Sequence, residues 1–359
     1  MGLRVPRKGF SLIPNSLMKL FSHFLSSAPA LLLLATLFLP TGCSRPKDRF
    51  VFEGNIANIQ QGEFYVYCDD GTFDGVDTIR IDGGSFSYER TLTTPTVLTL
   101  LYPNFSQTYI VAEPGEVVTM EGDASKLGEA DISGTEENKL LTEFRQKNAS
   151  ASENEARRAA ADFIHTHTPM LAAVALFKRY FAYDKTPDPS TTLTLLDDLL
   201  KAQPQNPTLA MLDNHLRPVL TTAAGQKLPQ FAFATLKGDS VRSTEFAGKP
   251  LVVAFWATWN NECTDLYAAL RRIGRDYKGR VGMLNVSLDD DKRLCRNRIQ
   301  RDSLVNVVYD GKGLDSPSAR RLGMRYVPGN LLVDAEGKIV ARDLAPDDLE
   351  KQLRALVKE

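Results

Sequence analysis

Residues 251–263, LVVAFWATWNNEC, decide the fold of the C-terminal part of this 359-residue chain. The segment opens with a continuous apolar run, Leu251–Trp256, which is typical of a strand buried on both faces of a sheet. From Asn261 to Tyr277, apolar and charged residues then recur at helical spacing. A fully buried strand followed at once by an amphipathic helix predicts an α/β domain.

The chain downstream continues the alternation of strands and helices. A second apolar run predicts another buried strand, two helices follow it, and a hairpin and a closing helix end the chain. These elements are predicted at Val281–Ser287, Asp289–Arg301, Ser316–Leu322, Asn330–Asp334 with Lys338–Asp343, and Asp347–Lys358. Apart from the short helix at Ser316–Leu322, the order is β-α-β-α-β-β-α, that of the thioredoxin fold, which we assign to residues 223–359.

Four segments of this region resemble the envelope thioredoxin-like proteins of the TlpA and AhpC/TSA type. They are GQKLPQF at 225–231, GKPLVV at 248–253, FWATW at 255–259 and VPGNLLVD at 327–334. The resemblance extends upstream, because a β-rich domain of uncharacterised function and a helical linker precede the redox domain in many Gram-negative lipoproteins of this kind. It therefore covers nearly the whole mature chain and implies a location in the cell envelope.

The resemblance implies thiol–disulfide exchange, but this chain departs from the family's motif. In the family, a Cys at the start of the helix attacks a disulfide, and a second Cys three residues later resolves the mixed disulfide. Here the motif reads Trp259-Asn260-Asn261-Glu262-Cys263, so Asn260 replaces the attacking Cys and only Cys263 remains as a catalytic candidate. The family also places a proline, usually cis, opposite this turn. We therefore predict a cis Val327–Pro328 bond facing Asn260, and a substrate groove formed by Trp256, Trp259, Asn260, Val327 and Pro328.

The missing thiol leaves three functional interpretations open. In the first, the domain has lost redox activity and serves as a binding or scaffolding module. In the second, it is an active thiol–disulfide oxidoreductase that uses Cys263 alone or with Cys295, although residues 223–359 contain no His to act as a general base. Relatives often carry an aromatic residue at the position of Cys295, which favours a packing role for it. In the third, the β-rich domain does the work, as in ligand binding, and the thioredoxin fold is structural.

The sequence predicts no cofactor and no metal site. Asp289-Asp290-Asp291 stands at the start of a predicted helix, where carboxylates commonly cap free backbone N–H groups. His165-Thr166-His167 places two imidazoles at i and i+2, and such side chains point apart on a helix. Neither pattern is typical of metal ligands.

Upstream of the α/β domain the sequence predicts two further regions. Residues 43–135 alternate apolar and polar side chains and carry turns such as Asp69-Asp70-Gly71 and Asp82-Gly83-Gly84, which predicts an all-β domain, a sandwich or a barrel. Residues 136–222 change to helical periodicity, with prolines at the boundaries, which predicts a helical linker layer.

Residues 1–42 are predicted to be a lipoprotein signal peptide. The apolar run Ala28–Leu39 has 12 residues, too few to cross a membrane core, and Pro40-Thr41-Gly42-Cys43 follows it. We therefore predict lipid attachment at Cys43 and a membrane-anchored protein that faces the periplasm or the cell surface. An ordinary cleaved signal is the alternative, because Pro40 stands where such sites usually carry Leu. Met18 would also open a signal of normal length, so it is an alternative start.

Composition limits the classes of partner. The chain has 43 Lys and Arg against 44 Asp and Glu, a net charge of -1, which gives no general case for nucleic-acid binding. A hydrophobic share of 43% excludes a polytopic membrane protein and a disordered chain, and four Cys are too few for a disulfide scaffold. The predicted partners are the membrane, through the lipid, and a protein partner or substrate at the groove between Trp259 and Pro328.

Overall fold

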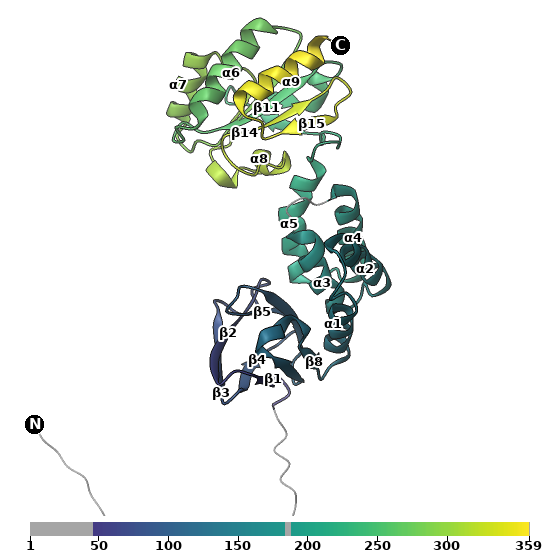
Figure 1. Ribbon diagram of the computed structural model, residues 1–359. Coiled ribbons are helices and arrows are strands. Elements are labelled where there is room, and N and C mark those ends of the chain that lie inside the picture. The colour runs from purple at the N-terminus through teal and green to yellow at the C-terminus, as the bar shows by residue number, and fades with distance from the viewer. Residues whose placement is uncertain (1–45, 184–187, 359) are drawn as a thin grey trace, which may run out of the picture. The chain divides into compact units, whose positions relative to one another are not determined.

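The computed structural model describes residues 46–183 and 188–358 of the chain (Figure 1). The predicted signal peptide and the predicted lipid attachment site, Cys43, lie outside the described residues. Within the described ranges, no helix is long and apolar enough to span a membrane. As the sequence predicts, a β-rich domain, a set of helices and an α/β domain follow one another along the chain.

Eight strands of the β-rich domain form one sheet, with the order β6-β5-β2-β3-β4-β1-β7-β8. All neighbouring strands are antiparallel except β1 and β7, which are parallel. Inward-facing side chains such as Phe50, Phe52 and Phe64 are fully buried, as period-two alternation predicts. The strands are β1 Arg49–Ala57, β2 Gln61–Cys68, β3 Asp77–Asp82, β4 Ser85–Thr91, β5 Thr96–Leu101, β6 Gln107–Ala112, β7 Val117–Asp123 and β8 Asp131–Ser133.

The first helix, α1 (Glu136–Lys147), hydrogen-bonds to both edge strands of this sheet. The side-chain amide of Asn138 donates to the carbonyl of Val111 in β6 at 2.7 Å and accepts from the N–H of the same residue at 3.0 Å. One turn further on, the hydroxyl of Thr142 makes the same pair of bonds to Ile132 in β8, at 2.8 and 3.1 Å. Both side chains are buried, so α1 satisfies backbone groups that an edge strand otherwise leaves unpaired.

Four more helices complete the middle region: α2 Glu153–Thr166, α3 Leu171–Phe177, α4 Pro189–Ala202 and α5 Pro207–Thr221. Helix α3 continues into a π turn, Lys178–Ala182, and contacts β5 and β6. The side chain of Lys178 is 1% exposed, and its Nζ lies 2.8 Å from Oδ2 of Asp69 and 4.9 Å from the ring centre of Tyr109. A buried ion pair therefore joins these helices to the sheet.

The α/β domain contains a five-stranded sheet with the order β13-β12-β11-β14-β15. Strands β11, β12 and β13 are parallel to one another, whereas β14 is antiparallel to both of its neighbours, β11 and β15. A small hairpin, β9 Ala232–Ala234 and β10 Ser240–Arg242, precedes this sheet. The other elements are β11 Leu251–Trp256, α6 Cys263–Asp276, β12 Gly282–Ser287, α7 Lys292–Asp302, β13 Val307–Val308, α8 Pro317–Arg321, β14 Gly329–Val333, β15 Ile339–Arg342 and α9 Pro346–Lys358.

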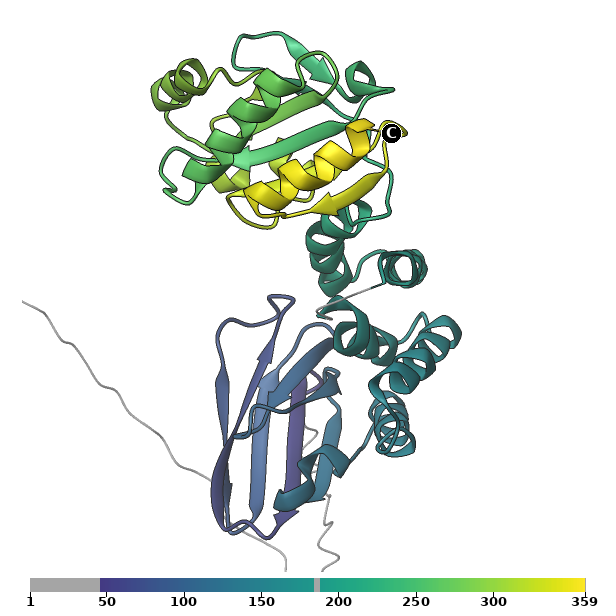
Figure 2. The ribbon, with the colours of Figure 1, turned by 45° about the horizontal axis from the view of Figure 1, so that its top comes forward.

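Strand β11 lies in the middle of this sheet and is buried along its whole length. Its alternate residues Val252, Ala254 and Trp256 pack with side chains of α6, α7 and α9. Val253 and Phe255 pack on the other face with residues of α8. Figure 2 shows α6 and α9 side by side over the sheet. This three-layer arrangement is the predicted thioredoxin fold, and it places the turn after β11 at the carboxyl end of the central strand.

Candidate functional site

Asn260 lies in the turn between β11 and α6 and is hydrogen-bonded to the cis-proline loop. Its Nδ2 donates to the carbonyl of Val327 at 2.7 Å, and the Val327–Pro328 bond is cis, as predicted. Its Oδ1 accepts from the backbone N–H of Glu262 at 2.9 Å. Asn260 therefore connects the turn before α6 to the loop that faces it.

Two exposed aromatic side chains adjoin this hydrogen bond. Trp259, next to Asn260, is 54% exposed, and Tyr326, next to Val327, is 51% exposed. The indole Nε1 of Trp259 donates to the carbonyl of Leu288 at 3.2 Å, which limits how the ring can turn. Sequence reasoning missed Tyr326, although an aromatic residue directly before the Val-Pro pair was a usable signal. We call the set Trp259, Asn260, Tyr326, Val327 and Pro328 the Asn260–Val327 surface.

Trp256 does not contribute to this surface, and its prediction as a groove residue is wrong. The side chain is 0% exposed and lies against Tyr267 of α6, with ring centres 5.5 Å apart and planes at 72°. Trp256 is the last residue of β11, and its side chain points to the face of the sheet that α6 covers. The aromatic residues of the FWATW segment therefore divide between the core and the surface.

Cys263, the predicted catalytic candidate, is the first residue of α6 and is completely buried. Burial raises the pKa of its thiol above the ordinary value, and this effect outweighs the hydrogen bonds that Ala257 and Tyr267 offer the sulfur. The thiol of Cys295 in α7 is equally buried, and burial raises its pKa to about 11. Both cysteines are free. Neither side chain combines the exposure and the low pKa that a reactive thiol requires.

Asp289 holds the turn that carries the surface residues in place. Its carboxylate is 1% exposed, and Oδ1 accepts from both the backbone N–H and the hydroxyl of Thr258, at 2.7 and 2.8 Å. Oδ2 accepts from the hydroxyl of Ser287 at 3.0 Å. The predicted capping role belongs to Asp291, whose Oδ1 accepts from two N–H groups at the start of α7. Sequence reasoning did not separate these two roles, because the three aspartates are adjacent.

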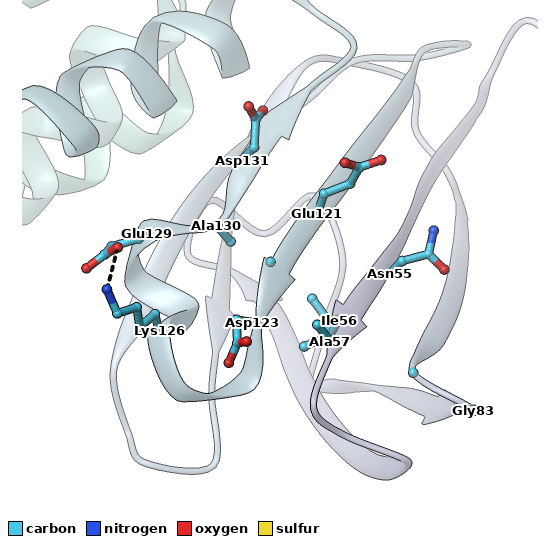
Figure 3. Close-up of a pocket in the computed structure, with 12 residues that line it drawn as sticks. Asn55, Ile56, Ala57, Gly83, Glu121, Asp123, Lys126, Glu129, Ala130 and Asp131 are labelled. Carbon is cyan, nitrogen blue, oxygen red and sulfur yellow. Dashed lines mark hydrogen bonds and ion pairs between the residues drawn. The ribbon is translucent and has the colours of Figure 1, made fainter.

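A cavity of about 790 Å³ lies in the β-rich domain, next to the end of β7 (Figure 3). Glu121, Asp123, Glu129 and Asp131 line it, and Lys126 forms an ion pair with Glu129 at 3.4 Å. Figure 3 shows these carboxylates spread around the cavity rather than directed at one point. Among the described residues, no group of three or more His, Cys, Asp or Glu side chains is arranged to hold a metal ion.

The β-rich domain and the α/β domain each match a known protein family. Residues 50–141 match the domain of unknown function DUF4369, and residues 224–342 match the AhpC/TSA family. The DUF4369 match extends past the eight strands into α1, the helix that hydrogen-bonds to both edges of the sheet.

Several named relatives match the α/β domain. The thiol-disulfide oxidoreductase ResA of Bacillus thuringiensis is 24% identical over 136 residues, covering 38% of this chain and 77% of ResA. Among solved structures, a thiol-disulfide oxidoreductase of Bacteroides fragilis is 31% identical with a TM-score of 0.34, covering 36% of this chain and 99% of that one. The C-terminal domain of a thiol-disulfide oxidoreductase of Bacteroides thetaiotaomicron is 33% identical with a TM-score of 0.36. The match covers 38% of this chain and 98% of that domain. The chain belongs to the thioredoxin-like proteins of the TlpA and AhpC/TSA type, with an N-terminal DUF4369 domain.

Proposed function

We propose that this chain is a redox-inactive, lipid-anchored envelope protein that binds a protein partner through the Asn260–Val327 surface. One observation carries the proposal. The side chain in the place of the attacking thiol is the carboxamide of Asn260, and it donates a hydrogen bond to the carbonyl of Val327 at 2.7 Å. A position that serves covalent exchange in the family serves here as a contact between the turn and the cis-proline loop.

The chemistry of the remaining groups supports the loss of redox activity. A carboxamide cannot form a mixed disulfide, so the first step of dithiol exchange has no nucleophile at Asn260. Cys263 is buried with a raised pKa, and only a thiolate is an effective nucleophile. Residues 223–359 contain no His that could remove a proton from it.

Binding, in contrast, suits the exposed residues of this surface. Trp259 and Tyr326 are each about half exposed, and Trp and Tyr are the residue types most enriched among those that dominate protein interfaces. Because the indole of Trp259 is already hydrogen-bonded to Leu288, a partner would meet a side chain that has lost part of its conformational entropy before binding.

Location and anchoring form a second part of the proposal. The relatives named above are thiol–disulfide oxidoreductases, and the protein disulfides that such enzymes act on persist mainly outside the cytoplasm. The apolar run that ends in Gly42-Cys43 supports export followed by lipid attachment at Cys43. The protein would then face the periplasm or the cell surface without a membrane-spanning helix.

Disulfide reduction tests the loss of redox activity. The wild-type protein should not accelerate the reduction of insulin by dithiothreitol. Asn260→Cys should accelerate it about tenfold or more over background, because a helix N-terminus lowers a thiol pKa from about 8.5 toward 7. The variant should also form a disulfide with Cys263 that protects the latter from alkylation after denaturation. Asn261→Cys is the matched control, since it adds a thiol to the neighbouring residue without restoring the Cys-x-x-Cys spacing.

Two results would contradict this part of the proposal. Robust wild-type turnover that Cys263→Ser abolishes would favour the alternative, an active oxidoreductase that uses Cys263 alone or with Cys295. An Asn260→Cys protein no faster than Asn261→Cys would mean that the Asn260–Val327 surface no longer admits a protein disulfide.

Site-specific crosslinking tests whether a protein partner binds at the Asn260–Val327 surface. A photoreactive amino acid in place of Trp259 or Tyr326 should yield a discrete crosslinked envelope protein in cells. The same amino acid in place of Tyr277 is the control, because Tyr277 follows α6 at the opposite end from Asn260. Equal crosslinking from all three positions would contradict a partner site at this surface.

A further inference from the structure

A cavity of about 580 Å³ lies in the α/β domain, apart from the Asn260–Val327 surface. It is formed by the turn between β9 and β10, the C-terminal half of α7 and the segment that leads into β13. No residue of the Asn260–Val327 surface lines it. Its volume lies within the range of about 300–1,000 Å³ that is typical of small-molecule sites.

The inner wall of this cavity is apolar. Leu304 and Val307 are buried, Leu236 and Ile299 are half-buried, and Val305 is 51% exposed. The exposed part of Val305, together with the partly exposed Leu236 and Ile299, provides apolar area that a ligand could cover. Such area favours a ligand with a hydrocarbon body, because covering it removes apolar surface from water.

Hydrogen bonds hold the cavity wall in its observed form. The N–H of Leu236 donates to the carbonyl of Val307 at 2.9 Å, which connects the β9–β10 turn to β13. The buried Asn285 donates through Nδ2 to the carbonyl of Val305 at 2.8 Å, and Asn306 donates to the carbonyl of Met283 at 2.9 Å. The segment before β13 is therefore attached to β12 at Val305 and at Asn306, so a ligand would find the cavity already formed.

The polar residues around the cavity give it a net positive charge. Lys237 and Arg296 line it, and neither forms an ion pair with any residue in the described parts of the chain. Other arginines of α7 are paired, Arg298 with Asp302 at 2.8 Å and Arg293 with Asp291 at 3.8 Å. One carboxylate, Asp239, also lines the cavity, and it accepts a hydrogen bond from the hydroxyl of Thr235. Two cations against one carboxylate leave a single positive charge for an anionic group.

We propose that this cavity binds a small amphipathic monocarboxylate, with the carboxylate at Lys237 and Arg296. The hydrocarbon part would lie against Leu236, Ile299 and Val305. An apolar wall next to two unpaired cations matches a molecule with one anionic end and an aliphatic body. This site is independent of the Asn260–Val327 surface, so either proposal can fail without the other.

Calorimetric titration with decanoate, below its critical micelle concentration, tests the proposal. The full chain carrying Cys43→Ala is used, because it keeps every described residue and lacks a lipid that could bind the probe. Decanoate should bind at one site, and decanol should bind about tenfold more weakly because it lacks the charge. Arg296→Gln should weaken decanoate binding about threefold to tenfold, as expected for a partly exposed ion pair. Arg301→Gln is the matched control, since it makes the same change on the same helix outside the cavity.

A second variant tests the apolar wall. Val305→Asp places a carboxylate next to the hydrocarbon part and should abolish decanoate binding while leaving the thermal unfolding transition in place. Decanol that binds as tightly as decanoate, or Arg301→Gln that weakens binding as much as Arg296→Gln, would overturn the proposal.

Discussion

At the scale of single residues, Asn260 makes two hydrogen bonds that a Cys could not match in strength. A Cys at this position could make only weak hydrogen bonds, whereas a carboxamide donates and accepts strong ones. Asn260 uses both of its groups, donating to Val327 and accepting from Glu262. Asn260 therefore contributes two contacts within the turn and the cis-proline loop, and its carboxamide is not a nucleophile for disulfide exchange.

Asp289 gives a testable prediction at the same scale. Asp289→Ala leaves the N–H of Thr258 and the hydroxyl of Ser287 without their partner in a buried position, so the free energy of unfolding should fall by about 1–3 kcal/mol. Because Thr258 directly precedes Trp259, the tryptophan emission of the folded variant should also shift. Urea unfolding and fluorescence measure the two effects.

The neighbouring aspartate provides the control for this prediction. Asp290 is exposed and its side chain does not cap α7, so Asp290→Ala should change the free energy of unfolding by less than about 0.5 kcal/mol. Equal stability losses from the two variants would mean that general charge, and not the bonds to Thr258, explains the effect of Asp289.

Sequence and structure agree at the residue scale where a linear motif carries the information. The Trp-x-x-x-Cys spacing identified Asn260 and Cys263, and the Val-Pro pair identified the cis bond. Trp256 and Asp289 were misread because their roles depend on elements far away in the sequence. Trp256 meets a helix that follows it, and Asp289 meets a turn about thirty residues earlier. Spacing alone carries no information about such contacts.

At the scale of elements, α1 offers a direct test of how the sheet is completed. Thr142→Val keeps the shape of the side chain but removes the hydroxyl that pairs with both backbone groups of Ile132. The free energy of unfolding should fall by about 1–3 kcal/mol, because two buried backbone groups lose their partner. Thr194→Val in α4 is the control, since the hydroxyl of Thr194 is exposed and bonds only within its own helix.

Chemical denaturation of the two variants measures this difference. A Thr142→Val protein as stable as Thr194→Val would mean that water or a rearranged strand replaces the hydroxyl, and that α1 contributes only apolar contacts to the sheet.

Helix positions were more predictable than strand pairing. Helix α4 begins at Pro189 after the cap Asp188, and α5 begins at Pro207 after the cap Asn206, so local chemistry places both helices. The parallel pairing of β1 with β7 has no comparable signal. Period-two alternation tells which face of a strand is buried, but the partner depends on the path of the whole chain.

At the scale of the whole molecule, the proposed lipid on Cys43 would hold the protein at a membrane. If lipid is attached there, the wild-type protein should enter the detergent phase in a phase-separation experiment, because each buried CH₂ contributes about 0.8 kcal/mol. Cys43→Ala should remain in the aqueous phase. Cys68→Ala is the control, since Cys68 is a free cysteine within the β-rich domain. Wild-type protein that stays aqueous, with an unmodified N-terminus, would exclude lipid attachment.

The hydrogen bonds from α1 to β6 and β8 also determine how long the sheet edges are open to pairing with another copy during synthesis. A chain leaves the ribosome N-terminus first, at about 5–20 residues per second, so all eight strands emerge before Glu136–Lys147 does. During that interval, the backbone groups of Val111 and Ile132 lack the hydrogen bonds that Asn138 and Thr142 of α1 later make to them. Two nascent copies on neighbouring ribosomes could pair their strands in this period, and the arrival of one short helix ends it.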